Sequence, residues 1–426
     1  MSASAIPAAQ FPARPSDIDA PPRLSRAHVP ALDGLRGIAV LLVIFFHFMV
    51  FLTDANGVFE RGLQKVAGLG WTGVDLFFVL SGFLITGILY DSKDSRHYFR
   101  NFYARRTARI FPLYYAFLLI MLVILPLFGR QVADFFQHVP WKTWPYWAYL
   151  SNFAKAYRWG QYLPPDTECL GITWSLAIEE QFYLVWPAIV LAFSRKTLLR
   201  MCLGLIGMSV LLRGWWVIWN PENANMAYVT FLRLDPLAVG AAISLLLRGP
   251  LGLTPHRRLA ARIAGAAPIA LVTINVTTGA LLYSPLFRVV GFTIVALFYG
   301  AILVLLLTAM PTNAAPRFFS SQPMRMFGKF SYAMYLFNQP VKYLLVATPL
   351  NPQRVGMVFG SQLPALMLFF AVGLACTTVA AWVSWNVLEK HFLRLKDLFP
   401  MEEDRKVTQP ALAQALGGAA PPGTAS

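Results

Sequence analysis

Ten long apolar segments constrain this chain more than any other feature of its sequence. Each is long enough to cross the hydrocarbon core of a bilayer as an α-helix, which takes about 20 apolar residues. Composition agrees, because 57% of the 426 residues are hydrophobic and only 13% are charged. The sequence therefore predicts an all-α fold, a polytopic membrane helical bundle of about ten transmembrane helices. The predicted spans are 33–52, 73–90, 107–127, 174–193, 199–219, 228–247, 263–283, 288–309, 330–348 and 362–388.

The chain ends and the basic residues predict the domain limits and the orientation. Residues 1–30 and 396–426 are rich in proline and small residues, so we expect disordered cytoplasmic tails around a transmembrane domain of residues 31–395. With a cytoplasmic N-terminus, 25 of the 36 Lys and Arg residues fall in inside segments, and both tails are cytoplasmic. This asymmetry accounts for the net charge of +16 without nucleic acid. The three cysteines predict neither a disulfide framework nor a metal site.

The first predicted span places a histidine deep in an apolar segment. His47 follows Arg36 by eleven residues, which is about 16 Å along a helix, or roughly half of a bilayer core. If Arg36 marks the membrane surface, His47 lies near the midplane, where a titratable side chain is costly. His47 is either a core histidine that bonds a neighbouring helix or part of a functional site, and its depth favours the site.

A cluster of arginines lies at the predicted cytoplasmic start of the third span, in the sequence FYARRTARIFPLYY. Arg106 and Arg109 are three residues apart and share a helix face, with Arg105 beside them. Basic residues in this place are typical of membrane topology alone. Because guanidinium groups also bind phosphate, an anion site facing the cytoplasm is an equal alternative.

Other polar residues lie within the predicted spans. Asp75 is near the outer end of the second span, and Ser81 lies at its middle beside a glycine. Such a small pair allows close helix packing or leaves room for a slender ligand. Glu179 lies about one turn inside the fourth span. Arg233 and Asp235 share the sixth span, and mutual charge compensation is their simplest interpretation.

The longest outer loop, 128–173, is rich in Trp and Tyr. Its segment 143–156 is too polar to span, and we expect it to re-enter the membrane or to lie at the interface. The aromatic residues favour an interfacial belt. A platform on which sugar rings stack is the alternative.

Six motifs follow one another along the chain: LDGLRGIAVLLVIFFHF, GVDLFFVLSGFLIT, FYARRTARIFPLYY, WSLAIEEQFYLVWP, RLDPLAVG and FGKFSYAMYLFNQP. In this order they resemble the motifs of the acyltransferase family 3 membrane proteins, over roughly residues 30–395. The resemblance implies a bacterial inner-membrane enzyme that transfers an acyl group, commonly acetyl from acetyl-CoA, to a sugar hydroxyl of a glycan, glycolipid or small product. It also implies the stand-alone type, because the 37 residues after Glu389 cannot hold a periplasmic esterase-like domain.

The resemblance assigns roles to individual residues. The arginine-and-histidine motif of the family matches Arg36 and His47. Its cytoplasmic arginine motif matches Arg106 and Arg109, and the acidic position of its WSL motif matches Glu179.

A later motif of the family matches Ser331 and Tyr332, which we expect to contact the substrates. This chain departs from the family at Asn338, where a histidine usually stands. Asparagine does not titrate, but it can still form hydrogen bonds at that position.

Acyl-CoA in the cytoplasm is the expected donor, and no metal is expected. Its phosphates would bind the arginines, including Arg105, and its pantetheine arm would pass Ser81 towards the midplane. Arg36 would orient the first helix or contact the CoA.

Catalysis is expected at His47, which would act as a general base on the acceptor hydroxyl or carry the acyl group itself. Asp75 or Glu179 would fix its tautomer. A transporter or flippase for a lipid-linked sugar or an anion is the rival hypothesis, and an inactive scaffold is a second. Acyl-CoA turnover by the purified protein separates these classes. The acceptor, the acyl length and the oligomeric state are not specified by the residues.

Overall fold

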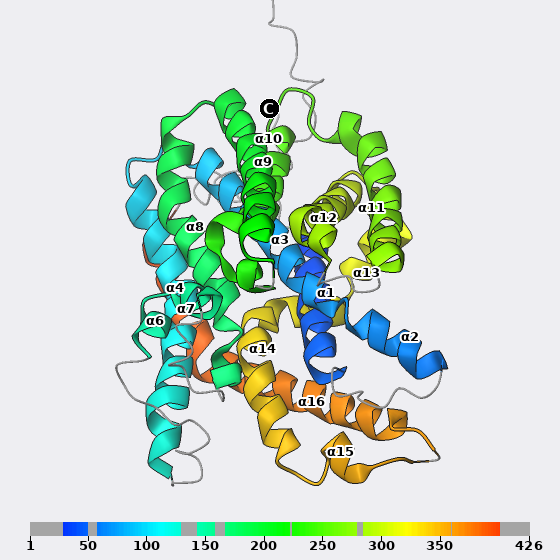
Figure 1. The fold of residues 1–426 in the computed structure, drawn as a ribbon. Coiled ribbons are helices and arrows are strands. Elements are labelled where there is room, and N and C mark those ends of the chain that lie inside the picture. Colours follow the sequence, from blue (N-terminus) through cyan, green and yellow to red (C-terminus); the bar gives the residue numbers. More distant parts are fainter. Residues whose placement is uncertain are drawn as a thin grey trace, which may run out of the picture.

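The structure is a computed structural model that describes residues 29–49, 58–128, 143–157, 167–221, 224–278, 284–358 and 360–400. Within these ranges the chain is helical, and its only β interaction is an isolated bridge between Val358 and Ser361. Eight of the helices described are long and apolar enough to cross a membrane. The predicted all-α polytopic membrane bundle is therefore confirmed (Figure 1).

Each of the ten predicted spans corresponds to one helix. They are α1 (Pro30–Met49), α3 (Gly73–Asp91), α4 (Tyr98–Leu119), α8 (Thr173–Ala192), α9 (Arg195–Trp219), α10 (Asp235–Leu247), α11 (Arg257–Thr278), α12 (Phe292–Leu307), α14 (Gln322–Val346) and α16 (Leu363–Ser384). Eight have the length and composition of a membrane span, while α10 has only 13 residues and the 25-residue α14 is more polar. The shorter helices are α2 (Val58–Ala67), α6 (Trp144–Trp147), α7 (Ser151–Ala156), α13 (Ala314–Phe319), α15 (Pro352–Val355) and α17 (Lys390–Arg394).

The sixth predicted span, 228–247, is wrong in its first half. The chain there forms two short 3-10 helices, Ala224–Tyr228 and Thr230–Leu232, and Pro236 lies in the first turn of α10. Irregular backbone at membrane depth is tolerated only where protein surrounds it. Leu232 and Arg233 are buried while Phe231 is 56% exposed, so the bundle covers one side of this segment.

Helices α1 and α14 run side by side in the same direction at the centre of the bundle. A methyl group added at Gly328 of α14 would collide with the main chain of Asp33 in α1. Further along both helices, His47 lies against Asn338. The glycine lets the two backbones touch, and this brings two of the motif-bearing segments together.

Helices α3 and α10 cross with equally close backbones and also run in the same direction, since Asp75 meets Arg233 at their starts and Asp91 meets Arg248 at their ends. A methyl group at Gly82 would meet the carbonyl oxygen of Leu237, and one at Gly240 would meet that of Val79. Close packing, one of the two expectations for the Ser81–Gly82 pair, is therefore present at the glycine.

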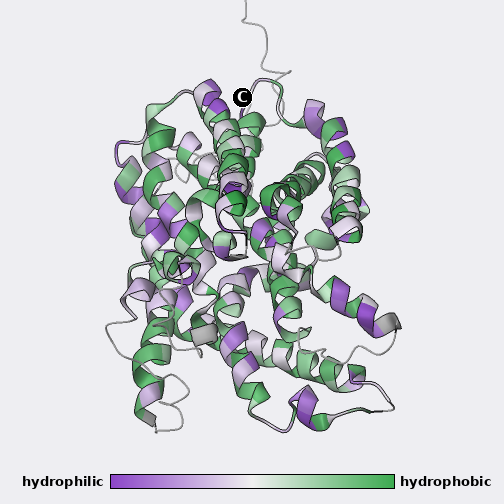
Figure 2. Cartoon of the chain, viewed as in Figure 1, coloured by the Kyte–Doolittle hydropathy of each residue, from purple (hydrophilic) through white to green (hydrophobic). Residues whose placement is uncertain are grey.

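The outer helices expose apolar side chains, as expected of a surface that faces lipid. Leu211 and Ile218 of α9 and Val276 of α11 are each about three-quarters exposed, at 75%, 74% and 75%. Figure 2 shows hydrophobic residues along α12 and α16, and hydrophilic residues concentrated in α2 and α15.

The predicted tails fall largely outside the described residues, which begin at 29 and end at 400. A 3-10 helix, η13 (Leu395–Leu398), continues past the predicted C-terminal boundary at 396. Main-chain carbonyls of the last described residues accept hydrogen bonds from α4, which orders this part of the chain.

Part of the aromatic loop is also described, as α6 and α7. Tyr146, Tyr149 and Asn152 are buried, and the Tyr114 hydroxyl of α4 donates to the Tyr146 carbonyl over 2.8 Å. Segment 143–156 therefore packs into the bundle without spanning it. Residues 129–142 and 158–166 of this loop lie outside the described residues.

Candidate functional site

A single pocket gathers most of the predicted site residues. It lies among α1, α3, α4, α8 and α14, and the space between its lining atoms is about 720 Å³, including the part open to solvent. Seven of the eleven predicted residues line it: Arg36, Ser81, Arg106, Arg109, Glu179, Ser331 and Tyr332. Residues separated by up to 296 positions in the sequence thus share one cavity because five helices converge there.

Three of the pocket side chains are guanidinium groups. Arg36 comes from α1, and Arg106 and Arg109 come from one face of α4, as their spacing predicts. The Arg106 guanidinium lies over the Tyr183 ring, 5.0 Å from its centroid. In the part of the chain that the structure describes, none of the three forms a direct ion pair. Three cations beside a cavity favour an anionic ligand.

Glu179 is the acidic side chain of this pocket. The hydroxyls of Ser81 and Tyr183 bond each other beside its carboxylate, which leaves one hydroxyl proton to donate to Glu179. Arg36 and Arg106 are its electrostatic neighbours. A carboxylate held in this way can order the hydroxyls and partly balance the arginines.

Three polar pocket residues received no role in the sequence analysis: Ser175, Tyr183 and Tyr335, the last of which matches the same family motif as Ser331 and Tyr332. The Tyr335 hydroxyl lies 2.7 Å from Ser175 Oγ and 3.1 Å from the Ile172 carbonyl oxygen. Helical spacing could have found all three residues. Ser175 and Tyr183 lie four residues before and after Glu179, and Tyr335 lies four after Ser331.

His47 lies outside the lining of this pocket, in the last turn of α1. Its Nδ1 atom is 2.6 Å from Asn338 Oδ1. The Asn338 amide nitrogen donates to the carbonyl oxygens of Met334 and Tyr335, so the oxygen is the atom that faces the histidine. An amide oxygen only accepts, so Nδ1 carries the proton and Nε2 presents a lone pair.

Arg36 and His47 are therefore not close together, although they share a helix. They are separated by about 16 Å along α1. Arg36 lines the pocket. Its level at the membrane surface and the midplane position of His47 both stay predictions.

The expected carboxylate beside His47 is replaced by the Asn338 amide. Asp75 lies instead against Arg233, whose Nη2 is 2.9 Å from Asp75 Oδ1. Glu179 is bonded within the pocket. A neutral amide can fix the tautomer as a carboxylate does, without adding a buried charge.

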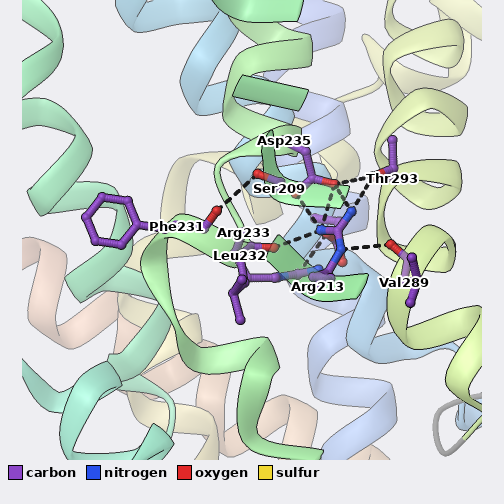
Figure 3. Close-up of polar contacts among 9 residues, drawn as sticks. Ser209, Arg213, Phe231, Leu232, Arg233, Asp235, Val289 and Thr293 are labelled. Carbon is purple, nitrogen blue, oxygen red and sulfur yellow. Dashed lines mark hydrogen bonds and ion pairs between the residues drawn. The ribbon is translucent and has the colours of Figure 1, made fainter. Parts of the chain in front are cut away.

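The predicted compensation between Arg233 and Asp235 is wrong, because each pairs with another helix. Arg213 of α9 lies 3.0 Å from Asp235 Oδ2, and both side chains are fully buried (Figure 3). Its other bonds go to the carbonyl oxygens of Leu232 and Val289 and to Thr293 Oγ1. Arg233 lies before α10, which begins at Asp235, so helical geometry does not hold the two side chains together and each reaches a different partner.

Arg105, the remaining predicted residue, also lies outside the pocket lining. Its Nη1 donates to the main-chain oxygen of Phe399 over 3.4 Å. It therefore links α4 to the C-terminal segment.

Comparison with known proteins decides the family. A family model described as an acyltransferase domain matches residues 29–385. The chain belongs to this acyltransferase family. Residues 29–385 include α1 and all the pocket residues.

Two relatives of this acyltransferase chain illustrate the family. It is 29% identical over 396 residues to the peptidoglycan O-acetyltransferase OatA of Listeria monocytogenes, with 88% of this chain and 59% of the relative covered. It is 25% identical over 347 residues to the O-acetyltransferase OatA of Staphylococcus aureus, with 74% and 51% covered. The chain thus spans about half the length of the curated relatives it matches. No solved structure matches it.

Proposed function

We propose that this chain is an integral-membrane O-acyltransferase that moves an acyl group, acetyl in the first instance, from acyl-CoA to a hydroxyl of a glycan sugar. Family membership and the names of the two relatives, both O-acetyltransferases, support the reaction class. The pocket carries the proposal, because it joins three arginines to a carboxylate and several hydroxyls. An anion transporter would have no reason to match the motifs of an acyltransferase family.

The donor would bind with its nucleotide at the arginines. Arg106 and Arg109 present guanidinium groups from one face of α4, and phosphate oxygens accept bidentate bonds from such groups. Ser81, Ser331 and Tyr332 line the same space and can bond the amides of a pantetheine arm. Acyl-CoA is made in the cytoplasm, so this end of the pocket would face inwards, as the basic residues predict.

The route from the pocket to His47 would follow the matched faces of α1 and α14. Ser331, Tyr335 and Asn338 recur at spacings of four and three, so they share one face of α14. Ser331 and Tyr335 line the pocket, and Asn338 holds His47. The thioester would therefore pass Tyr335 to reach the imidazole.

Two chemical routes fit a lone pair on His47 Nε2. As a general base, His47 takes the hydroxyl proton while the acceptor oxygen attacks the thioester carbon, the C–S bond breaks, and the imidazolium returns the proton to the thiolate. As a nucleophile, Nε2 attacks the thioester carbon and the C–S bond breaks, which gives an acyl-imidazolium and a thiolate. The acceptor oxygen then attacks the acyl carbon, the bond from that carbon to Nε2 breaks, and the hydroxyl proton passes to the thiolate. Asn338 serves both routes, because it holds the proton on Nδ1.

The acceptor would arrive from the outer side of a bacterial cytoplasmic membrane, with both chain ends in the cytoplasm. The Listeria relative is named for peptidoglycan. We infer a glycan acceptor of that kind, presented opposite the arginines. Donor and acceptor would meet at His47 from opposite sides, and only the acyl group would cross.

Replacing His47 by alanine tests the proposal. We expect the purified His47→Ala protein in nanodiscs to unfold at the same temperature as the wild type. Release of CoA thiol from acetyl-CoA, with muropeptides as acceptor, should fall by about 10²–10⁴-fold, the usual contribution of a general base. Unchanged turnover would overturn the role of His47, and a wild type that never consumes acetyl-CoA would overturn the function.

A further inference from the structure

The C-terminal segment lies across α4 beside the arginines of the pocket. After α16 the chain forms a π-helix, η12 (Trp385–Glu389), followed by α17 and η13, and all three pack on α4. The Asn101 amide donates to the Pro400 carbonyl oxygen over 2.8 Å, and Arg105 donates to that of Phe399. These bonds hold η13 at the predicted cytoplasmic end of α4 (Figure 1).

This arrangement brings Lys396 of η13 to the arginine cluster. Its ammonium is half-buried, and its electrostatic neighbours are Arg109, Arg105 and Arg106. Among the described residues, the only acidic neighbour of Lys396 is Asp397, whose side chain is exposed. Like charges gathered at partly buried positions repel one another, because water screens them incompletely.

A second carboxylate of this region belongs to Glu389, at the end of the π-helix. Glu389 is buried and accepts a 3.0 Å hydrogen bond from Ser384. It is an electrostatic neighbour of Arg109, the arginine that also lines the pocket, whereas the charges that act on Lys396 are those of the three arginines and Asp397. Lys396 therefore adds a positive charge beside Arg105, Arg106 and Arg109.

Another lysine near this segment has a different environment. Lys329 of α14 lies over the Trp385 ring, with its ammonium 4.4 Å from the ring centroid. The ring compensates that charge within the protein. Among the described residues, Lys396 has neither such a ring contact nor an ion pair.

We propose that Lys396 is a donor-binding residue, which contacts the phosphate groups of the nucleotide of acyl-CoA at the mouth of the pocket. The inference rests on the proposed function and extends its donor site to the C-terminal segment. A polyanionic nucleotide neutralises clustered cations that the protein leaves unbalanced. Pantetheine without the nucleotide carries no phosphate and would gain nothing from Lys396.

Two donors of different charge test the assignment. In nanodiscs of zwitterionic lipid, Lys396→Ala should raise KM for acetyl-CoA by roughly tenfold, the usual effect of losing one charged hydrogen bond. KM for S-acetyl-pantetheine should stay within about twofold of the wild type. Lys396→Arg should restore most of the affinity for acetyl-CoA, because the charge is kept.

Arg394→Ala is the matched control, since Arg394 is an exposed cation on α17 in the same segment. Its KM for both donors should match the wild type. If Lys396→Ala weakens both donors equally, or neither, the assignment is overturned while the acyltransferase function stands. An effect that appears only with added phosphatidylglycerol, for both donors, would show that Lys396 binds lipid headgroups instead. A wild type inactive with both donors would overturn the proposed function itself.

Discussion

The arginines inside this bundle are of two kinds, which differ in how far other groups of the protein balance their charge. Every guanidinium nitrogen of Arg213 is bonded, to Asp235, Thr293 or main-chain carbonyls. Arg36, Arg106 and Arg109 line a cavity beside one carboxylate, without a direct ion pair among the described residues. A charge satisfied by the protein holds helices together, whereas a charge left beside a cavity is available to a ligand.

Another buried arginine, Arg233, is intermediate between these two cases. One of its nitrogens bonds Asp75, and its guanidinium stacks 4.1 Å from the centroid of the Phe292 ring. Its Nε and Nη1 atoms and Asp75 Oδ2 are buried and have no hydrogen-bond partner among the residues that the structure describes. Burial alone therefore does not separate structural from functional arginines, and the count of satisfied atoms is the better guide.

The largest effect is expected at the fully satisfied arginine. Arg213→Ala would leave the Asp235 carboxylate buried without its cation, which typically costs about 3–5 kcal/mol. The bonds from α9 to the loop before α10 and to α12 would be lost as well. We expect a large loss of folded protein in detergent, measured by fluorescence-detected size exclusion and by thermal unfolding.

A double variant separates charge from packing at this site. Arg213→Met combined with Asp235→Leu removes both charges and keeps apolar volume, so it should recover much of the stability. If Arg213→Ala alone unfolds at the wild-type temperature, the network does not hold these helices together, and the contrast between the two groups disappears.

These arginines also show which contacts can be predicted from the sequence. Helical spacing placed Arg106 and Arg109 on one face, and the structure puts both in the pocket. The spacing argument works because it concerns neighbours on a single helix. It could not pair Arg213 with Asp235 or Arg233 with Asp75, since these contacts depend on how separate helices cross.

The same limit explains the outcome at His47. The depth of His47 in an apolar segment predicted a functional role. Its hydrogen-bond partner, Asn338, lies on a helix that follows almost 300 residues later in the sequence. A carboxylate was expected because Asp75 and Glu179 both lie in the predicted outer half of the membrane, where His47 was expected to need a partner. Asn338, which seemed a departure from a family motif, is the residue in contact.

A smaller effect, and on a different property, is expected at the pocket arginines. Arg109→Ala removes a cation that has no direct partner, so the unfolding temperature should be unchanged or slightly raised. KM for acyl-CoA should increase by about ten- to a hundredfold, as for the loss of a charged hydrogen bond worth about 1.5–3 kcal/mol. Steady-state kinetics with varied acetyl-CoA would measure it.

Arg96→Ala is the control for Arg109, because Arg96 is exposed near the start of α4, outside the pocket lining. It should change neither KM nor stability. Arg109→Lys should recover only part of the affinity, since an ammonium cannot bind phosphate bidentately. If Arg109→Ala loses stability but keeps its affinity for acyl-CoA, Arg109 belongs with Arg213 among the structural arginines.

The smallest effect on stability is expected when the aspartate of each ion pair is replaced separately by the isosteric asparagine. Asp235 accepts bonds from Arg213 and Thr293, whereas Asp75 accepts from Arg233 alone. Asp75→Asn should therefore lower the free energy of unfolding by about 1 kcal/mol, and Asp235→Asn by at least twice as much. Chemical denaturation in detergent micelles would compare them. Equal losses would show that bond count does not rank the two pairs. If Asp75→Asn instead stops acyl transfer while the fold keeps its stability, Asp75 serves the reaction, as its predicted catalytic role requires.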